Sequence, residues 1–417
     1  MKFSSFGQRY SRHSGISQLM EDLGHALSGD KKLLMLGGGN PAHIPEVQAF
    51  LQERLQRMAE NPAELAHVIG NYDPPKGESQ FINALARLFR DQYGWNIGPE
   101  NIALTAGSQS AFFLLFNMFA GDFDDGGHKQ ILFPLAPEYI GYSDVALSDN
   151  CFTANKPEIE TFPDRTFKYH VDFDSLTIGG NVGAICVSRP TNPTGNVLSD
   201  EEMHKLSARA RNFDIPFIVD NAYGMPFPNI IFTEASLCWD ENIILCMSLS
   251  KVGLPGARTG IVIANETVVD AIARMNAIFS LALGSLGPAL GYDLVNSGEI
   301  LRLSNNIIKP YYERKAKFAF EIFKSELEGV DHYIHKAEGA LFLWLWFPGL
   351  PITSEELYQR LKRRGVLILS GHYFFPGLEE DWTHKHECIR VSYPMPDEVV
   401  RAGIKIIAEE VKKAFGK

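Results

Sequence analysis

An aspartate and a lysine in this sequence stand directly after apolar runs that have the character of buried strands. Asp220 lies in "IVDNAYGMPFPN" at 218–229, and Tyr223 follows three positions later. Lys251 lies in "CMSLSKVGLPGARTG". A buried carboxylate needs a cationic partner, and a lysine amine can bond covalently to a carbonyl compound. Each residue alone is more simply a helix cap or a surface charge, but the two together indicate chemistry on a bound ligand.

The elements around these residues must position them. From about residue 100 to 265, short and almost continuously apolar runs alternate with longer helical patterns. Such runs are typical of strands covered on both faces. The helical segment 199–213 has Ser199 as a predicted N-cap and Glu202 to complete a capping box. The alternation predicts an α/β fold whose mainly parallel, doubly wound sheet binds ligands at the carboxyl ends of its strands.

Polar and aromatic residues follow five of the predicted strands, and a doubly wound sheet would bring them to one edge. Helix caps, turns or surface charges explain each motif alone. The whole set suits one cofactor, pyridoxal 5′-phosphate, which needs an amine for its aldehyde, a carboxylate for its ring nitrogen, and N–H groups with a cation for its phosphate. The set is Gly107, Ser108, Gln109, Tyr139, Asn192, Asp220, Tyr223, Ser248, Lys251 and Arg258.

Charge and composition exclude several classes of partner. The 39 Lys and Arg against 50 Asp and Glu give 417 residues a net charge of −11, which argues against a nucleic acid or an anionic membrane. The apolar run "ALFLWLWF" at 340–347 is too short to span a bilayer and is interpreted as a buried strand. The first residues lack the pattern of a secretory signal, and five cysteines show no paired spacing. We therefore expect a cytoplasmic protein.

The sequence predicts two domains. Residues 50–305 are expected to form a large cofactor-binding domain. Residues 1–49 and 306–417 are expected to form an N-terminal arm and a smaller α+β domain. In the second part a long helical pattern should be kinked or broken at Pro310.

At this point the sequence resembles the fold-type I, aspartate-aminotransferase-like enzymes that use pyridoxal phosphate. The resemblance runs from "LGGGNPAHIP" (36–45) to "IRVSYP" (389–394), and its most specific motifs are "SLSKVGLPGARTG", "NPTG" and the D-x-x-Y of Asp220 and Tyr223. Four stretches, "SGISQLMEDLG", "CVSRPTNPTGNV", "DNAYGMPFPNIIF" and "EGALFLWLWF", resemble the members that transfer an amino group between valine and pyruvate.

The resemblance implies a role for each residue around the cofactor ring. Lys251 would bond to the aldehyde and then move the proton between the substrate and the cofactor. Asp220 would pair with the ring nitrogen, Tyr223 and Asn192 would bind the ring oxygen, and Tyr139 would stack on the ring face. The kinetics should be ping-pong, with an amino acid and a 2-oxo acid as substrates.

The resemblance also implies which residues bind the phosphate and the substrate carboxylate. Gly107, Ser108, Gln109, Ser248 and Arg258 would bind the phosphate. Tyr72 of "NYDPPKG" would reach the phosphate of a neighbouring subunit, so the protein should be at least a homodimer. For the substrate, Arg390 would bind the α-carboxylate in a bidentate fork beside Asn192, and Gly39 would let the backbone approach closely.

Several alternatives stay open. No arginine is assigned to a second substrate carboxylate, which favours an apolar donor, but alanine, 2-aminobutyrate or an aromatic amino acid could replace valine. Ile16 could line the pocket for the side chain of the donor, or it could have an ordinary packing role. A C–S β-lyase would share the fold and the lysine. The spacing of His372, His384, His386 and Cys388 matches no zinc pattern, so no metal is expected. A regulator that binds DNA would need a domain for which residues 1–50 are too short.

Overall fold

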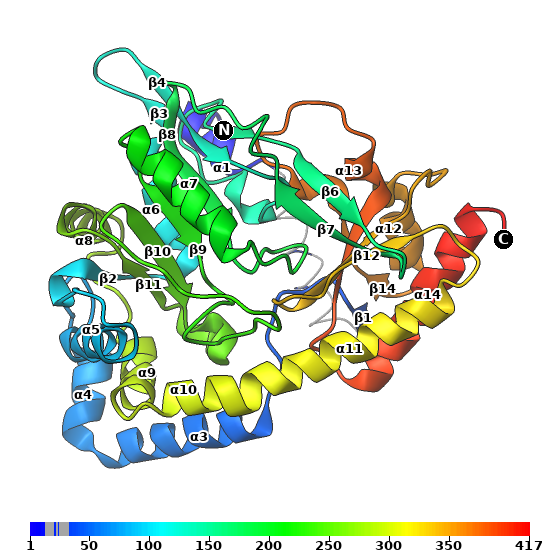
Figure 1. Cartoon of the computed structure of the whole chain (residues 1–417). Helices are drawn as coiled ribbons and strands as arrows, with labels where there is room; N and C mark the ends of the chain where they lie inside the picture. The colour runs from blue at the N-terminus through cyan, green and yellow to red at the C-terminus, as the bar shows by residue number, and fades with distance from the viewer. Residues whose placement is uncertain (13–20, 22–23, 25–32) are drawn as a thin grey trace.

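The computed structural model describes residues 1–12, 21, 24 and 33–417 of the chain. A large sheet with its helices occupies one side of the molecule, and a smaller sheet with α12, α13 and α14 occupies the other (Figure 1). The long helix α11 runs beneath both sides. The helices of the smaller side are α11 (Lys309–Glu326), α12 (Ser354–Arg363), α13 (His384–Glu387) and α14 (Asp397–Ala414).

The large sheet has the order β2-β11-β10-β9-β8-β4-β3, with β5 also paired to β4. The neighbouring strands β10, β9, β8, β4 and β5 are parallel, whereas β11 runs antiparallel to both β10 and β2. This confirms the prediction of an α/β fold with a mainly parallel sheet. The strands are β2 (Ile102–Thr105), β3 (Gly121–Asp122), β4 (His128–Phe133), β5 (Phe152–Ala154), β8 (Val182–Ser188), β9 (Phe217–Asp220), β10 (Ile243–Ser248) and β11 (Gly260–Ile263).

Successive residues of these strands enter cores on opposite faces of the sheet. In β10, Leu245 belongs to one core cluster, whereas Ile244 and Cys246 belong to the other. Helices α6 and α8 cover the second cluster, and α5, α7 and α9 contribute to the first. Burial on both faces explains why the strands read as continuous apolar runs. The helices are α5 (Ser79–Tyr93), α6 (Ser108–Phe119), α7 (Asp200–Asn212), α8 (Glu266–Ser280) and α9 (Leu286–Asn296), and Ser199 and Glu202 form the predicted capping box of α7.

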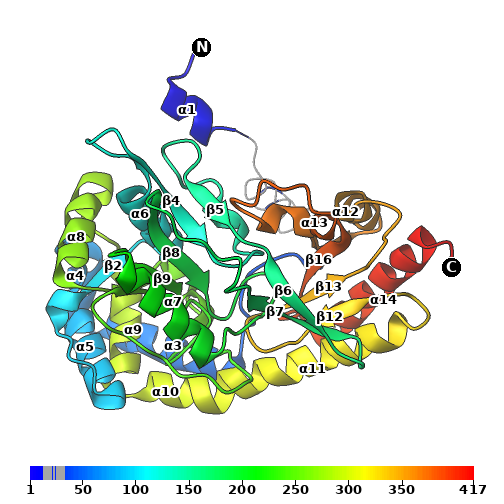
Figure 2. The same cartoon turned by 45° about the horizontal axis from the view of Figure 1, so that its top comes forward.

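The smaller sheet has the order β15-β16-β13-β12-β7-β6 and mixes segments that lie far apart in the sequence. The hairpin of β6 and β7 lies between two strands of the large sheet in the sequence, yet β7 pairs with β12 (Figure 2). The predicted division at 305 takes no account of this hairpin, and the domain boundaries stay a prediction. The strands are β6 (Pro157–Thr161), β7 (Thr166–Val171), β12 (Tyr333–His335), β13 (Phe342–Trp346), β15 (Leu369–Ser370) and β16 (Cys388–Ser392).

Pro310 does not interrupt the helical path as sharply as expected. It occupies the first turn of α11, where its missing N–H is tolerated. The π-helical turn η5 (Ser304–Ile308) joins α11 to α10 (Glu299–Leu303), so the change of hydrogen-bonding pattern falls just before the proline.

The N-terminal segment reaches both sides of the molecule. Strand β1 (Leu34–Met35) pairs in parallel with β14 (Val366–Leu367), and the following residues lead toward the large sheet through α3 (Pro45–Glu60) and α4 (Pro62–Gly70). Helix α1 (Ser5–Tyr10) is tied by Arg9 to the carbonyl oxygen of Ala146 at 3.1 Å. Across the described ranges, no helix is long and apolar enough to cross a bilayer.

Candidate active site

Most of the predicted cofactor-binding residues lie at or after the ends of β2, β4, β8, β9 and β10, whose carboxyl ends lie at one edge of the large sheet. Arg390 reaches the same place from β16 of the smaller sheet. The charges of Arg390 and Asp220 influence the pKa values of both Lys251 and Tyr139, as does that of Arg258. The fold therefore brings together charged groups from both sides of the molecule.

Lys251 lies in the short helix η3 (Ser250–Val252), directly after β10. Its Nζ donates a hydrogen bond of 2.6 Å to the carbonyl oxygen of Gly39 and lies 5.4 Å from the centre of the Tyr223 ring. Withdrawal from water, with the positive charge of Arg390, lowers the pKa of Lys251 to about 8. A substantial fraction of the amine is therefore neutral near physiological pH, as a nucleophile or base requires.

Asp220 is the last residue of β9. Its Oδ2 accepts a hydrogen bond of 2.7 Å from the Tyr142 hydroxyl, and its Oδ1 accepts one of 3.0 Å from the Ala222 N–H. Burial raises the pKa of Asp220, while the Tyr142 and Ala222 donors oppose that rise. The two donors hold the carboxyl group in place, and a cationic partner bound there would favour its charged form.

A turn at Gly107 leads from β2 into α6 and lies against the Arg258 guanidinium. Gly107 has φ +85°, and a side chain there would clash with Arg258. The Arg258 Nη2 donates a hydrogen bond of 3.4 Å to the Ala106 carbonyl oxygen. The first N–H groups of a helix have no partner within the helix, so this turn offers N–H donors and a cation to an anion.

Arg390 is buried between aromatic rings. The guanidinium carbon lies 4.0 Å from the centre of the Phe342 ring and 5.2 Å from that of Phe374. Its Nη1 donates to the Asn192 Oδ1 at 2.6 Å and its Nη2 to the Gly37 carbonyl oxygen at 2.5 Å. Burial lowers the pKa of Arg390 to about 10, and its Nε has no hydrogen-bond partner. A buried donor of this kind is suited to a carboxylate ligand.

Comparison with known proteins shows the family. The model of the family aminotransferase class I and II matches residues 31–407. The chain is a class I and II aminotransferase. It is 53% identical over 415 residues to the valine–pyruvate aminotransferase of Escherichia coli (strain K12), a match that covers 100% of this chain and 99% of that protein.

Solved structures of relatives have the same fold as this aminotransferase. The crystal structure of the valine-pyruvate aminotransferase from Salmonella typhimurium LT2 is 53% identical, with a TM-score of 0.89 over 97% of this chain and 100% of that chain. A crystal structure from Psychrobacter arcticum 273-4 is 48% identical, with a TM-score of 0.97 over the whole of both chains. The fold is thus that of a fold-type I transferase.

The cofactor of this aminotransferase family is pyridoxal 5′-phosphate, and the residues present fit it. The Gly107 turn and Arg258 suit a phosphate. Asp220 suits a protonated ring nitrogen, and the Lys251 amine, with its lowered pKa, suits an aldehyde. The unpartnered Nε of Arg390 is a free donor that suits a carboxylate.

The remaining predicted ring contacts also lie within the site. Tyr139 packs beside Gly141, where an added side chain would clash with its ring. The Tyr223 ring lies near Lys251 and contacts Phe342 at 6.0 Å between ring centres. Gln109 uses its side-chain Nε2 to donate to the Gly141 carbonyl oxygen at 3.0 Å, so the side chain supports the Tyr139 segment.

For the remaining predicted residues the structure gives the position where it is described, and their contacts with cofactor or substrate stay predictions. The Ser248 Oγ lies 2.9 Å from the Ser250 Oγ and accepts from the Ser250 N–H at 3.0 Å, so it holds the turn that carries Lys251. Its contact with phosphate stays a prediction. Tyr72 is 82% exposed on the surface. Ser108 is the first residue of α6, and Ile16 lies outside the described residues.

Sequence reasoning missed five side chains that support the site. Phe342 and Phe374 enclose Arg390, and Tyr142, Ser188 and Glu138 form a line of hydrogen-bonding groups behind Asp220. One signal for Glu138 was available, because it follows a strand in "LAPEYIGY", where a charged residue is unexpected in a buried segment. The two phenylalanines gave no signal, since they look like ordinary core residues.

The histidine-rich segment ahead of Arg390 packs against the smaller sheet. The buried His384 lies 2.5 Å from the Tyr169 hydroxyl and 3.6 Å from the Cys388 Sγ, measured from its Nε2. The rings of His372 and His386 are stacked 5.8 Å apart. Within the part of the chain that the structure describes, no three His, Cys, Asp or Glu side chains are grouped so that they could hold a metal ion.

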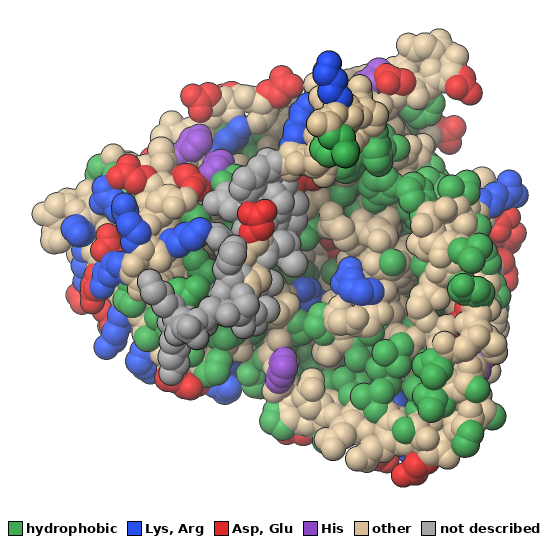
Figure 3. All heavy atoms as spheres, turned by 180° about the vertical axis from the view of Figure 1, so that it is seen from behind, with side chains coloured by type: hydrophobic (Ala, Val, Ile, Leu, Met, Phe, Trp, Pro, Cys, Tyr) green, Lys and Arg blue, Asp and Glu red, His purple; other side chains and the backbone are tan. Residues whose placement is uncertain are grey.

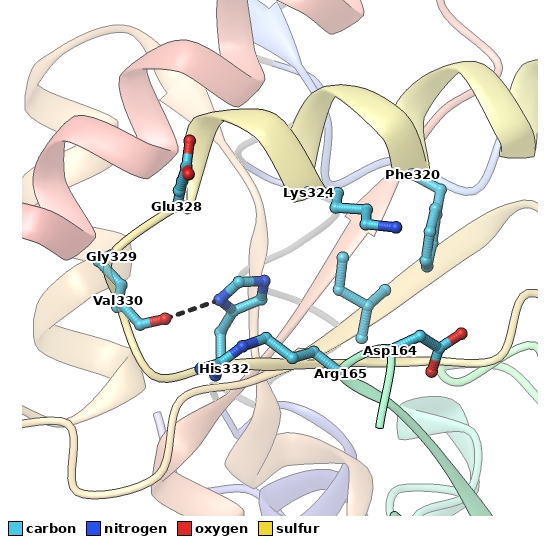
Figure 4. A pocket seen from close by; sticks show the side chains of 9 residues that line it. Asp164, Arg165, Phe320, Lys324, Glu328, Gly329, Val330 and His332 are labelled. Carbon is cyan, nitrogen blue, oxygen red and sulfur yellow. Dashed lines mark hydrogen bonds between the residues drawn. The ribbon is translucent and has the colours of Figure 1, made fainter. Parts of the chain in front are cut away.

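A separate cavity of about 400 Å3 lies between the end of α11 and the β7 hairpin (Figure 4). Lys324, Arg165, Asp164 and Glu328 line it, so positive and negative side chains are mixed. His332 Nδ1 donates to the Val330 carbonyl oxygen at 2.9 Å. None of the predicted site residues lines this cavity.

Proposed function

We propose that this aminotransferase moves the amino group of L-valine to pyruvate and releases 2-oxoisovalerate and L-alanine. The observation that carries the proposal is Arg390, whose buried guanidinium has an unpartnered Nε and whose charge acts on Lys251. A carboxylate bound there places the α-carbon of an amino acid near the lysine amine. The names of the relatives from Escherichia coli and Salmonella typhimurium support the choice of valine and pyruvate.

Different residues of the site carry out substrate binding and proton transfer. Bound pyridoxal phosphate supplies the aldehyde that accepts the amino group and a ring that withdraws electrons from the α-carbon. Arg390 binds the substrate carboxylate, with Asn192 and Gly37 holding the guanidinium in place. With the cofactor bound, the neutral Lys251 amine would be the base that takes the proton from the substrate α-carbon and the acid that then gives it back.

The remaining site residues orient the cofactor and the substrate. Asp220 would favour a proton on the cofactor ring nitrogen by its negative charge. Tyr223 and Asn192 bind the ring oxygen, and Tyr139 covers the ring face. Gly107, Ser108, Gln109, Ser248 and Arg258 bind the phosphate, and Gly39 borders the substrate carboxylate.

The charges of the site favour an apolar substrate side chain. Among the described residues, the charged groups that influence the pKa of Lys251 are Arg390, Asp220 and Arg258. Each has a role in the proposed mechanism, so none of the three is left for a second carboxylate on the substrate. Alanine and 2-aminobutyrate differ from valine by one or two carbon atoms, so discrimination among them should be only about 1–3 kcal/mol.

We also propose a cytoplasmic homodimer in which Tyr72 reaches the phosphate of the neighbouring subunit. Hydrophobic side chains gather on the half of the molecule that carries α4 and α8 (Figure 3). Tyr72 and Ile278 are more than four-fifths exposed, and Phe279 and Leu281 are largely exposed. A second copy of the chain would cover such side chains. Sedimentation velocity should give a dimer, and Tyr72→Phe should weaken cofactor binding without changing the mass.

One spectroscopic experiment tests the reaction. The absorbance of the purified protein with pyridoxal phosphate is recorded alone, after L-valine, and after pyruvate. We expect valine to remove the visible band of the bound cofactor and pyruvate to restore it, with one alanine formed for each valine consumed. A band that valine leaves unchanged would contradict valine as the donor while leaving the cofactor site intact.

The same samples separate transamination from β-elimination. A C–S β-lyase would release pyruvate and ammonia from a cysteine conjugate and form no amino-acid product. The proposed function requires alanine to appear and ammonia to stay at its background level.

A further inference from the structure

Glu138 is a buried carboxyl group that the proposed mechanism does not use. It lies between β4 and the short helix η2 (Ile140–Tyr142) and is fully buried. Its Oε1 accepts a hydrogen bond of 2.8 Å from the Ser188 N–H, and its Oε2 is hydrogen-bonded to the Ser188 hydroxyl. Among the described residues, no Lys, Arg or His forms an ion pair with it. Burying a carboxylate without a cationic partner costs free energy. The protonation state of Glu138 is therefore central to what this residue does.

A continuous line of oxygen atoms joins Glu138 to Asp220. The Ser188 Oγ lies 3.3 Å from the Tyr142 hydroxyl, which donates to the Asp220 Oδ2 at 2.7 Å. Ser188 ends β8 and Asp220 ends the neighbouring parallel strand β9, where the two residues are register partners. Sheet pairing therefore fixes the distance between the two ends of the line.

The number of hydrogens on this line decides how it is connected. If Glu138 is ionised, the Ser188 hydroxyl donates to it and the Tyr142 hydroxyl donates to Asp220, so no hydrogen remains for the contact between Ser188 and Tyr142. If Glu138 is protonated, it donates to Ser188, Ser188 donates to Tyr142, and Tyr142 donates to Asp220. In the second arrangement every contact holds one hydrogen, and successive bonds in one direction strengthen one another.

The charges around Glu138 favour the second arrangement. Burial raises the pKa of Glu138 to about 8, although the hydrogen bonds from Ser188 and from the Tyr139 backbone oppose the rise, and the nearby negative charge of Asp220 adds to it. The other titratable groups that interact with it are Tyr142 on η2 and Cys186 on β8, and neither can carry a positive charge. For two carboxyl groups placed in this way, one negative charge on the pair costs less free energy than a negative charge on each. Asp220, which has the ring nitrogen as its cationic partner, retains the charge.

We propose that Glu138 is a positioning residue that acts as a neutral acid through Ser188 and Tyr142 to strengthen the hydrogen bond on Asp220. This inference rests on the proposed function insofar as Asp220 faces the cofactor ring. The line of donors stabilises the Asp220 charge and thereby sets how strongly the ring nitrogen is held as a cation.

Packing makes the line suitable for testing by substitution. The Tyr142 ring is stacked on Phe133, with centres 5.6 Å apart and planes 2° apart, and it also contacts Phe112 at 4.9 Å. Tyr142→Phe therefore removes the hydroxyl and keeps the ring in place. Glu138→Gln keeps a donor toward Ser188 and an acceptor for its N–H, so it imitates the protonated acid. Glu138→Leu and Ser188→Ala break the line.

The test uses the holoenzyme without any amino acid present. The visible band of the enzyme-bound cofactor is titrated with pH, and the dissociation constant of the cofactor is measured for each variant. A less stabilised Asp220 charge makes the ring less able to withdraw electrons, so the midpoint of the band should move to higher pH. We expect Tyr142→Phe and Ser188→Ala to raise it by about half a unit or more, while Glu138→Gln stays within about 0.2 unit of the parent.

Turnover gives a second measurement. We expect Tyr142→Phe to lower kcat about tenfold with little change in KM, and Glu138→Gln to keep kcat within about twofold. Thermal unfolding identifies any variant that fails to fold. If Glu138→Leu is such a variant, Ser188→Ala carries the test, because it leaves the backbone hydrogen bond to Glu138 intact.

Two results would overturn the proposal. A midpoint that moves to lower pH in Glu138→Gln would show that Glu138 carries a negative charge in the parent enzyme. A midpoint unchanged in both Tyr142→Phe and Ser188→Ala would show that the line does not act on Asp220. If valine fails as the donor but these midpoints move as expected, the proposed substrate is wrong and the role of Glu138 stands.

Discussion

The two ends of the active site are built in different ways. The end proposed to face the cofactor ring is formed by residues at the carboxyl ends of neighbouring parallel strands, among them Asp220 at the end of β9 and Lys251 after β10. The end proposed to bind the substrate carboxylate is formed by Arg390, Asn192 and Gly37, which come from three distant parts of the chain. The first end comes from one sheet, whereas the second requires segments of both sheets.

The two ends also differ in how their charges are partnered. Both oxygen atoms of Asp220 already accept hydrogen bonds from the protein, and one belongs to the line that begins at Glu138. Arg390 is held by two acceptors and two aromatic rings, yet its Nε has no partner. The carboxyl oxygens of the ring end are thus already held by the protein, whereas the carboxylate end keeps one donor free for a ligand.

Lys251 stands between the two ends, and its loss should have the largest effect. We expect Lys251→Ala to reduce transamination below detection, because no other described amine lies at this position to bond to the cofactor and move the proton. Borohydride should no longer trap cofactor on the chain. Cofactor that is still trapped, located by peptide mass mapping, would place the reactive amine elsewhere.

A substitution at the ring end should have the next largest effect. Asp220→Asn keeps the shape but removes the charge that keeps the ring nitrogen protonated, so kcat should fall about 100-fold or more. The measurement is single-turnover decay of the cofactor band on adding valine. Asp220→Glu is the matched control and should recover part of the rate, and an equal loss in both variants would point to shape rather than charge.

A substitution at the carboxylate end should cost less and act on the substrate alone. Arg390→Lys should lower kcat/KM at least about tenfold for every amino-acid donor, or about 1.4 kcal/mol, because lysine cannot form the bidentate fork. The dissociation constant of the cofactor should stay unchanged. If cofactor binding weakens as much as kcat/KM, the two ends are not separate.

The smallest expected effect is that of pH on the rate of cofactor binding, which depends on the pKa of Lys251. The neutral amine is the nucleophile, and the pKa of Lys251 is lowered to about 8, so binding of pyridoxal phosphate to the apoprotein should speed up as the pH rises through 8. The rate should rise about tenfold from pH 7 to 9 and then level off, whereas a lysine with an ordinary pKa would gain about 100-fold over that range.

Arg390→Met provides the control for this pH dependence. The positive charge of Arg390 helps to lower the pKa of Lys251, so its removal should move the rate profile to higher pH. An unmoved profile in stopped-flow absorbance would mean that burial alone lowers the pKa of the lysine amine.

The ring end could be predicted from the sequence to a large extent, and the carboxylate end only in part. Strand ends are visible as apolar runs followed by polar residues, and the carboxyl ends of parallel strands meet at one edge, so Asp220 and Lys251 were expected together. Arg390 was named only through the resemblance to a family. Its partner Gly37 and its enclosing rings Phe342 and Phe374 had no signal of their own in the sequence.

The sequence by itself determined the fold class, the large sheet and the chemical types gathered at its edge, because burial on both faces of a sheet leaves a local apolar pattern in each strand. Only the tertiary structure decided that the β6–β7 hairpin joins the smaller sheet, that Arg390 meets Asn192, and that Ser188 and Tyr142 join Glu138 to Asp220. The reason is physical: these contacts depend on which distant segments pack together, and no local periodicity records the partner across such a distance.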